Sequence, residues 1–356
     1  MDRREEVLHK VSLVRAELLR SEACGVLVRE QPNFSWLTAG GRGFLGLAAT
    51  VSCAWVLVTQ DNLYILANSI EGGRIVREEL PGDLFQLQTI PWAQDGGLFN
   101  FADKLAGGGI ATDAEWGDWF AAVRTRLLPS EKDRFRVLGR NTASALEETL
   151  KSAVSGITEF EAAGAVSAAL WSKGIEPISI FAGADERSEQ VRHFIPTNKC
   201  ANAKLILSVC ARCGGLVISA TRTVYFSEIA EQQKQKHYSL LKVEAEAFRV
   251  LEERLSLGNM FTAMCDAYTR EGLKGEWEKH HQGGITGYLP RELRIDKNTE
   301  RFAATGEAYA FNPSCFGAKV EDTVLLEENG IAVITPCGDW PVVTVNGLPR
   351  PDILLK

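Results

Sequence analysis

The feature that most constrains the fold of this chain is a repeated order of predicted helices and strands in its C-terminal part. Two neighbouring segments have helical character, and runs typical of buried strands follow them. The same order returns later, although the two halves share too little identity to be called a sequence repeat. Helices are expected at 142–154, 162–171, 234–255 and from about 260, and strands at 178–182, 204–211, 216–226, 308–312, 322–327, 331–335 and 342–345. The order predicts an α+β domain built from a duplicated α-α-β unit.

The N-terminal part has a different pattern. Val7, Val11, Val14 and Leu18 recur at intervals of three and four, which predicts an amphipathic helix. A short strand is expected at 25–30, and a hairpin is expected from 54–59 and 63–67 around the turn at 60–62. Residues 32–41, punctuated by proline and glycine, are expected to form a loop. These patterns indicate a smaller α/β domain.

The length of 356 residues also favours two domains over a single core. A polar segment at 129–136 separates the two patterns. We therefore expect an N-terminal α/β domain at 1–137 and a C-terminal domain at 138–356.

The composition excludes some partners. A net charge of −7 argues against a sequence-independent grip on nucleic acid, which needs a basic surface. No apolar run reaches the roughly 20 residues that span a bilayer. The charged N-terminal segment lacks the apolar block of a signal peptide, so we expect a cytoplasmic protein. The eight cysteines are scattered, as is typical of reduced thiols, and the lone pair Cys210 and Cys213 lacks the second pair of a zinc ribbon.

Three segments of the C-terminal part carry a family resemblance. The first runs from Ser208 to Thr223 and ends in Thr-Arg-Thr, the second is the glycine-rich stretch from His281 to Glu292, and the third holds Asn312-Pro-Ser and then Glu321-Asp-Thr. In this order they resemble the pita-bread family of aminopeptidase P, prolidase and creatinase. The upstream stretch around His193 is similar to the histidine-bearing active-site segment of that family. The resemblance covers about residues 140–356.

The resemblance places the five metal-ligand positions of the family on Ser208, Ser219, His281, Asn312 and Glu321. Three of the four carboxylates that the family uses are therefore missing. Two divalent ions about 3.5–4 Å apart need anionic ligands around them. We accordingly expect no metal pair and no other cofactor, while a single weakly held ion on His281 and Glu321 stays open.

The remaining polar residues define the candidate site. His193 resembles the histidine that creatinase, a metal-free relative, uses as its acid–base group, and His281 with Glu321 is expected to form a second proton-handling pair. Substrate-binding roles are expected for Ser208, Ser219, Tyr288, Arg291 and Asn312. Each residue also has an ordinary explanation: a surface or buried histidine, a hydrogen-bonded carboxylate, a core phenol or a solvated charge.

Three functions follow as hypotheses. The leading one is a metal-independent, creatinase-like enzyme that cleaves a C–N bond in a small polar amidine, amide or amino-acid derivative. The alternatives are a non-catalytic binding protein and a residual Xaa-Pro aminopeptidase or dipeptidase. The resemblance also implies a homodimer. The ligand expected for the candidate site is a small polar substrate, and the net charge and the lack of a long apolar run argue against nucleic acid and membrane as partners.

Overall fold

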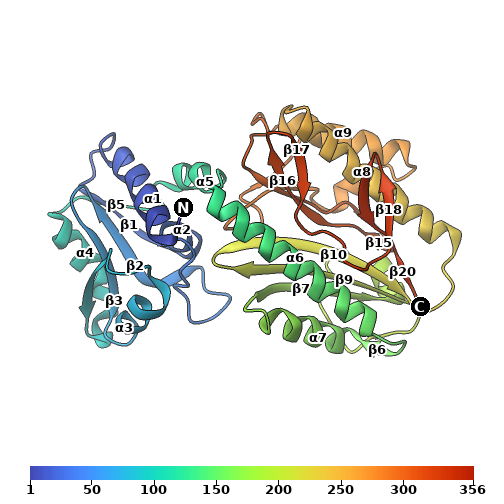
Figure 1. The fold of residues 1–356 in the computed structure, drawn as a ribbon, viewed down its shortest axis with the longest axis horizontal. Helices are drawn as coiled ribbons and strands as arrows, with labels where there is room; N and C mark the ends of the chain where they lie inside the picture. The colour runs from blue at the N-terminus through green and yellow to red at the C-terminus, as the bar shows by residue number, and fades with distance from the viewer. The chain divides into compact units, whose positions relative to one another are not determined.

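The structure, a computed structural model, describes all 356 residues and divides into two compact units (Figure 1). The first comprises residues 1–124 with 214–216, and the second comprises 125–213 and 217–356. None of the helices is both long enough and apolar enough to cross a membrane.

The first unit is a five-stranded sheet with helices on both faces (Figure 1). The strands lie in the order β4-β3-β2-β1-β5; β1 and β2, and β2 and β3, pair antiparallel, while the two outer pairings are parallel. The predicted hairpin is confirmed, because Val58 pairs with Leu63. The elements are α1 (Arg3–Leu18), β1 (Gly25–Glu30), α2 (Gln31–Leu37), β2 (Val51–Thr59), β3 (Leu63–Asn68), α3 (Gly72–Arg74), β4 (Gln86–Ile90), α4 (Leu98–Ala106), β5 (Ile110–Thr112) and α5 (Gly117–Arg124).

One local prediction in this unit is wrong. Residues 32–37 of the expected loop lie in α2, with Pro32 in its first turn. Proline is tolerated there because the first amides of a helix have no intrahelical acceptor to lose. The burial of Phe34, Trp36 and Leu37 against the rest of the unit stabilises the helix.

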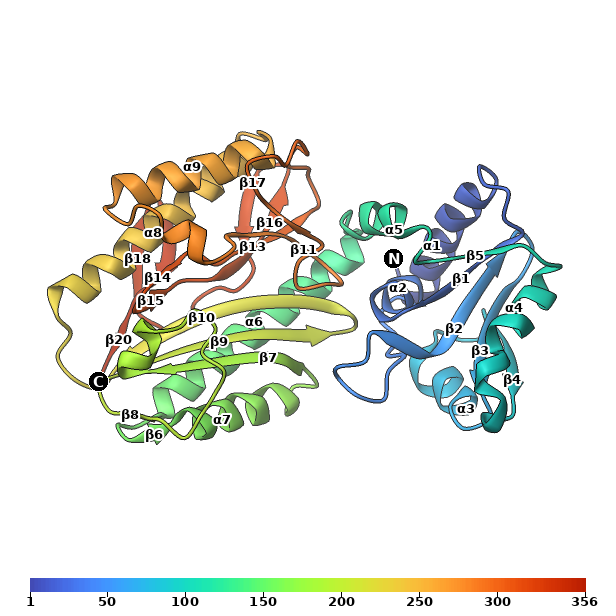
Figure 2. The same ribbon diagram turned by 180° about the vertical axis from the view of Figure 1, so that it is seen from behind.

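The second unit contains two sheets, each covered by a pair of helices (Figures 1 and 2). The first sheet has the order β20-β10-β9-β7 and packs against α6 and α7. The second has the order β12-β11-β13-β16-β17, and its core is shared with α8 and α9. The elements are α6 (Pro129–Ser152), α7 (Glu159–Trp171), β7 (Glu176–Ala184), β9 (Lys204–Cys213), β10 (Leu216–Tyr225), α8 (Glu231–Glu252), α9 (Leu257–Arg270), β11 (Gly283–Thr286), β12 (Leu293–Arg294), β13 (Ala308–Phe311), β14 (Ser314–Cys315), β15 (Ala318–Lys319), β16 (Asp322–Glu327), β17 (Gly330–Val333), β18 (Val342–Val345), β19 (Leu348–Pro351) and β20 (Leu354–Leu355).

The predicted boundary between residues 137 and 138 falls inside α6, whereas the two units divide between Arg124 and Thr125. The polar segment is the first turns of this helix rather than a linker. Pro129 lies at its start, and the Glu131 carboxylate accepts a hydrogen bond from the Leu128 amide at 2.7 Å. Phe135 and Leu138 are buried, whereas Asp133 and Arg140 are exposed, so the charged residues of this segment lie on the outer face of an amphipathic helix.

Two features bring the motifs of the second unit together. A bridge between Thr221 and Glu321 joins β10 to the segment before β16, with the Thr221 amide donating to the Glu321 carbonyl at 2.9 Å. In β11, Gly283 and Gly284 have φ angles of 112° and 147°, and an added Cβ at Gly284 would lie 2.0 Å from the Leu293 carbonyl oxygen. At these two positions the flanking strands β13 and β12 approach the backbone of β11 too closely for any side chain.

Candidate functional site

The second unit encloses a cavity of about 390 Å³ at the place where the three sequence motifs meet. Strands β7 and β9, the segments on either side of β11, and the segment from Asn312 to Glu321 supply its walls. The cavity is lined by Ser179, Phe181, His193, Ser208, Val209, Cys210, His280, His281, Leu289, Pro290, Arg291, Arg294, Asn312, Lys319 and Glu321. Six of the eight predicted site residues are therefore brought together, namely His193, His281, Glu321, Ser208, Arg291 and Asn312.

Glu321 is buried and paired with two cations. The Lys319 Nζ lies 2.8 Å from Glu321 Oε2, and the Arg291 Nη2 lies 3.0 Å from Glu321 Oε1. The Thr221 hydroxyl donates a further hydrogen bond to Oε2 at 3.1 Å. Burial alone would raise the pKa of Glu321, but the charges of Lys319 and Arg291 outweigh it and hold that pKa below its ordinary value. Glu321 is therefore a carboxylate whose two oxygens are already occupied.

Ser208 lies beside this ion pair. Its hydroxyl accepts a hydrogen bond from the Lys319 ammonium at 3.0 Å and lies 2.6 Å from the Thr221 hydroxyl. The serine thus helps to fix the lysine, which is only 5% exposed. A buried ammonium needs such partners because an unpaired one is costly.

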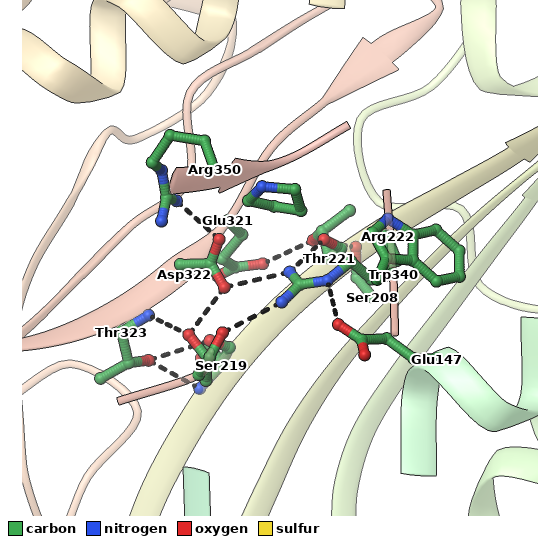
Figure 3. Close-up of polar contacts among 12 residues, drawn as sticks. Glu147, Ser208, Ser219, Thr221, Arg222, Glu321, Asp322, Thr323, Trp340 and Arg350 are labelled. Carbon is green, nitrogen blue, oxygen red and sulfur yellow. Dashed lines mark hydrogen bonds and ion pairs between the residues drawn. The ribbon is translucent and has the colours of Figure 1, made fainter. Parts of the chain in front are cut away.

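Two predicted substrate-binding residues do not line the cavity. Ser219 and Thr323 hold β10 to β16, because the Ser219 amide donates to Thr323 Oγ1 at 3.1 Å and the Thr323 hydroxyl donates to the Ser219 carbonyl at 2.9 Å (Figure 3). Tyr288 points away from the cavity, and its hydroxyl donates to Glu131 of α6 at 2.5 Å. The Ser219 hydroxyl, by contrast, lies 3.2 Å from Cys210 Sγ and accepts a hydrogen bond from Arg291 Nη1 at 3.5 Å, so it contacts two residues that line the cavity. A substrate-binding role for Ser219 or Tyr288 stays a prediction.

Three histidines form a cluster along one wall. The ring centroids of His193 and His280 are 4.9 Å apart, and those of His280 and His281 are 4.8 Å apart. The Asn312 side-chain amide donates to His280 Nε2 at 3.1 Å, so the network assigns the proton to Nδ1, which donates to the Ser314 hydroxyl at 2.9 Å. His280 is thereby fixed as a neutral imidazole in one tautomer.

All three imidazoles are held neutral near pH 7. Burial, helped by the Lys319 charge, lowers the pKa of His280 to about 2. Burial and the Arg291 charge lower the pKa of His281 to about 4. Burial and the Lys319 charge also lower the pKa of His193, which remains the most exposed of the three.

The expected proton-handling pair of His281 and Glu321 does not form. Both Glu321 oxygens bind Lys319, Arg291 and Thr221, while the Nδ1 atom of His281 is buried without a hydrogen-bond partner. The two side chains therefore share no hydrogen bond, because Lys319 and Arg291, whose approach could not be read from sequence spacing, bind the Glu321 carboxylate instead. A joint role in proton transfer stays a prediction.

The backbone of Glu321 is anchored by its neighbour. Asp322 accepts hydrogen bonds from Arg222 at 3.0 Å and from Arg350 at 2.6 Å, and Arg222 also donates to Glu147 of α6 at 3.1 Å (Figure 3). The charged side chains of these four residues are at most 3% exposed. Successive residues of an extended chain point to opposite faces, so fixing Asp322 on one side directs Glu321 into the cavity on the other.

The family model for metallopeptidase family M24 matches residues 133–328, more than half of the chain. The chain belongs to metallopeptidase family M24. The probable dipeptidase PepE of Mycobacterium tuberculosis is 21% identical over 294 residues, which cover 80% of this M24 chain and 74% of PepE.

Solved structures agree on the fold. The prolidase from Pyrococcus horikoshii superposes with a TM-score of 0.75 at 17% identity, over 93% of this chain and 99% of that one. The N-terminal domain of the FACT complex subunit SPT16 from chickpea gives a TM-score of 0.68 at 12% identity, over 95% and 96%. The predicted pita-bread fold is thereby confirmed.

The metal pair that the family name implies does not fit this M24 chain. Of the five corresponding positions, only Glu321 is anionic, and its oxygens bind Lys319 and Arg291. Two divalent ions need several carboxylates, and here two cationic side chains lie where those ligands would have to converge. The five positions thus carry one negative charge, that of Glu321, and the charges of Lys319 and Arg291 neutralise it.

The histidine cluster is the other metal-ligand candidate. Its ligand nitrogens lie within 4.8 Å of one another. Tetrahedral zinc, with bonds of about 2.0–2.1 Å, brings its nitrogens to about 3.4 Å. Both ring nitrogens of His280 are hydrogen-bonded, and the charge of Lys319 acts on His280 and His193. This arrangement favours hydrogen-bonded imidazoles over a coordinated cation.

Sequence reasoning missed three basic residues of the cavity: His280, Arg294 and Lys319. One signal was present for Lys319, because residues two apart in an extended segment share a face and Lys319 is two before Glu321. His280 directly precedes a named candidate. Arg294 lies on β12 at the exposed side of the cavity and carried no motif.

Proposed function

We propose that this M24 chain is a metal-independent enzyme that cleaves a C–N bond in a small polar molecule. The observation that carries the proposal is the pairing of Glu321 with Lys319 and Arg291 in a cavity that also holds neutral His193. The cationic side chains supply fixed positive charge, which can stabilise an oxyanion as it develops. The dipeptidase and prolidase relatives, by their names, also act on C–N bonds.

His193 is the general base in this proposal. Its lowered pKa keeps it neutral near pH 7, and it is the most exposed of the three imidazoles, so it can accept a proton from an attacking water. The same proton then passes to the leaving nitrogen. His281 also lines the cavity, so its imidazole ring can contact the substrate. His280 is a positioning residue, since Ser314 and Asn312 fix its ring.

The test is a turnover screen with and without a chelator. Amides, amidines, N-acyl amino acids and Xaa-Pro dipeptides are incubated with the wild type, with His193→Gln and with His9→Gln, a control at an exposed position of α1. We expect turnover that survives EDTA and falls about 10²–10⁴-fold in His193→Gln only, as is typical for loss of a general base. Equal turnover in His193→Gln and wild type contradicts the assignment.

Two other outcomes separate the alternatives. Cleavage of Xaa-Pro dipeptides that EDTA abolishes and Mn²⁺ restores identifies a residual metallopeptidase. The absence of turnover on every class favours a binding protein, a reading supported by the likeness to a domain named as part of a multi-subunit complex. In that case a pull-down with the wild type and a cavity variant, Arg294→Gln, shows whether the cavity contacts the partner.

A further inference from the structure

The cavity has an excess of positive charge. Lys319, Arg291 and Arg294 line it, and Glu321 is its only carboxylate. The histidines add no negative charge, so the side chains lining the cavity sum to three positive charges and one negative charge. An amidinium or ammonium ligand, considered from the sequence alone, would have to lie among like charges. Like-charge contacts of this kind disfavour a partner.

Hydrogen-bond donors in the cavity wall lack acceptors. Arg291 donates through Nη2 to Glu321 and through Nη1 to the Pro290 carbonyl at 2.6 Å, whereas its buried Nε has no partner. The arginine side chain is only 8% exposed. Lys319 uses two of its three N–H donors on Ser208 and Glu321. Arginine and lysine have no acceptor atoms, so the group that satisfies them must be an acceptor.

Arg294 completes the arrangement at the exposed side of the cavity. It lies on β12, and its charge acts on both His193 and His281. An oxyanion placed between Arg294 and the inner pair of cations would contact positive charge on both sides. Guanidinium groups match the planar, two-oxygen edge of carboxylates and phosphates.

We propose that the cavity is an oxyanion site, so that a carboxylate or phosphate group of the ligand takes the place that the family name assigns to metal ions. The inference rests on the proposed function only in naming the substrate class, an anionic molecule with its C–N bond next to His193. The volume of about 390 Å³ suits a small metabolite rather than a long peptide.

The experiment measures binding rather than turnover, so that it is independent of the proposed chemistry. Inorganic phosphate and N-acetylglycine serve as the phosphate and carboxylate probes, and benzamidine serves as the cation probe. Binding is followed by calorimetry and by thermal shift at two salt concentrations. We expect both anions, or one of them, to bind more weakly at high salt, and benzamidine not to bind.

Three variants locate the site. Arg294→Gln removes a charge that forms no ion pair within the protein, and it should weaken anion binding at least 10-fold. Arg291→Lys keeps the charge but removes Nε, and should also weaken binding while the fold is retained. Arg249→Gln, on the exposed face of α8, should bind as the wild type does.

Binding that survives both Arg294→Gln and Arg291→Lys, or tighter binding of benzamidine than of either anion, overturns the oxyanion site. Anion binding without turnover of any substrate supports this site and counts against the proposed catalysis instead. Turnover confined to neutral or cationic substrates, with no inhibition by the anions, supports catalysis and overturns the anionic substrate class.

Discussion

The ammonium of Lys319 lies 2.8 Å from Glu321 Oε2, inside the cavity of the second unit. The family to which the chain belongs is named for metal-dependent chemistry. A lysine side chain there supplies a fixed positive charge to the one carboxylate that this chain keeps among the five ligand positions. Arg291 supplies a second charge from the other side. The negative charge of Glu321 is thus balanced by two side chains of the protein.

The first prediction concerns this pair. Lys319→Met should lower the free energy of unfolding by about 3 kcal/mol, because it leaves Glu321 buried with one cation fewer. Adding Glu321→Gln should recover at least about 1 kcal/mol of that loss, since the two residues are coupled. Urea denaturation of the four proteins gives the cycle. Lys242→Met, which removes an exposed pair with Glu271, is the control and should change stability by less than about 1 kcal/mol. Additive effects of the two cavity changes would contradict the coupling.

The second prediction concerns metal content. Protein purified without chelators should carry well below one Mn²⁺, Co²⁺ or Zn²⁺ per chain by elemental analysis. Added Mn²⁺ should leave Tm unchanged, because a ligand that binds only the native state would raise it. A stoichiometric pair of ions bound at Ser208, His281 and Glu321 would contradict this description of the cavity. A single zinc ion that binds the wild type but not His280→Gln would show that the three histidines coordinate a metal.

The third prediction concerns pH. Burial lowers the pKa of His237 to about 4, below its ordinary value near 6.5, while its Nε2 lies 3.1 Å from the Pro351 carbonyl. Between these values the unfolded chain binds a proton that the native chain does not, so stability falls as pH drops from about 6.5 to about 4, by roughly 3 kcal/mol. His237→Gln lacks this proton. The stability gap between wild type and variant, measured by urea denaturation, should therefore change across this window and be constant above pH 7.

The comparison of the wild type with His237→Gln also controls for the titration of other groups. Burial raises the pKa of Glu244 to about 7, which gives a trend of opposite sign, but that trend is common to both proteins and cancels in the difference. Parallel curves for the wild type and His237→Gln from pH 7 to pH 4 would show that His237 is not held neutral.

The fourth prediction concerns the anchor behind the site. Arg222→Met should lower the free energy of unfolding by about 3–5 kcal/mol, because it leaves Asp322 and Glu147 buried without one of their cationic partners. Arg222→Lys should lose less, since it keeps the charge but not the forked geometry. Arg249→Met on the surface should have little effect. A small loss in Arg222→Met would show that Arg350 alone holds Asp322.

The sequence alone determined what depends on neighbouring residues. Apolar spacing located α1 and the hairpin of β2 and β3, and the order of helices and strands gave the duplicated layout of the second unit. The loss of carboxylates at Ser208, Ser219 and Asn312 was visible because ligand identity is a property of single positions. The early start of α6 and the short helix α2 were missed, since burial of a few residues outweighed the local polar and proline signals.

Only the tertiary structure decided which groups meet in the cavity. Glu321 is joined there by Arg291, thirty residues earlier, and by Lys319, two residues earlier, while the Tyr288 hydroxyl donates to Glu131 outside the cavity. The sign of the cavity charge follows from this convergence and from the burial that keeps the histidines neutral. Charges act through space and through the local dielectric, neither of which can be read along a chain.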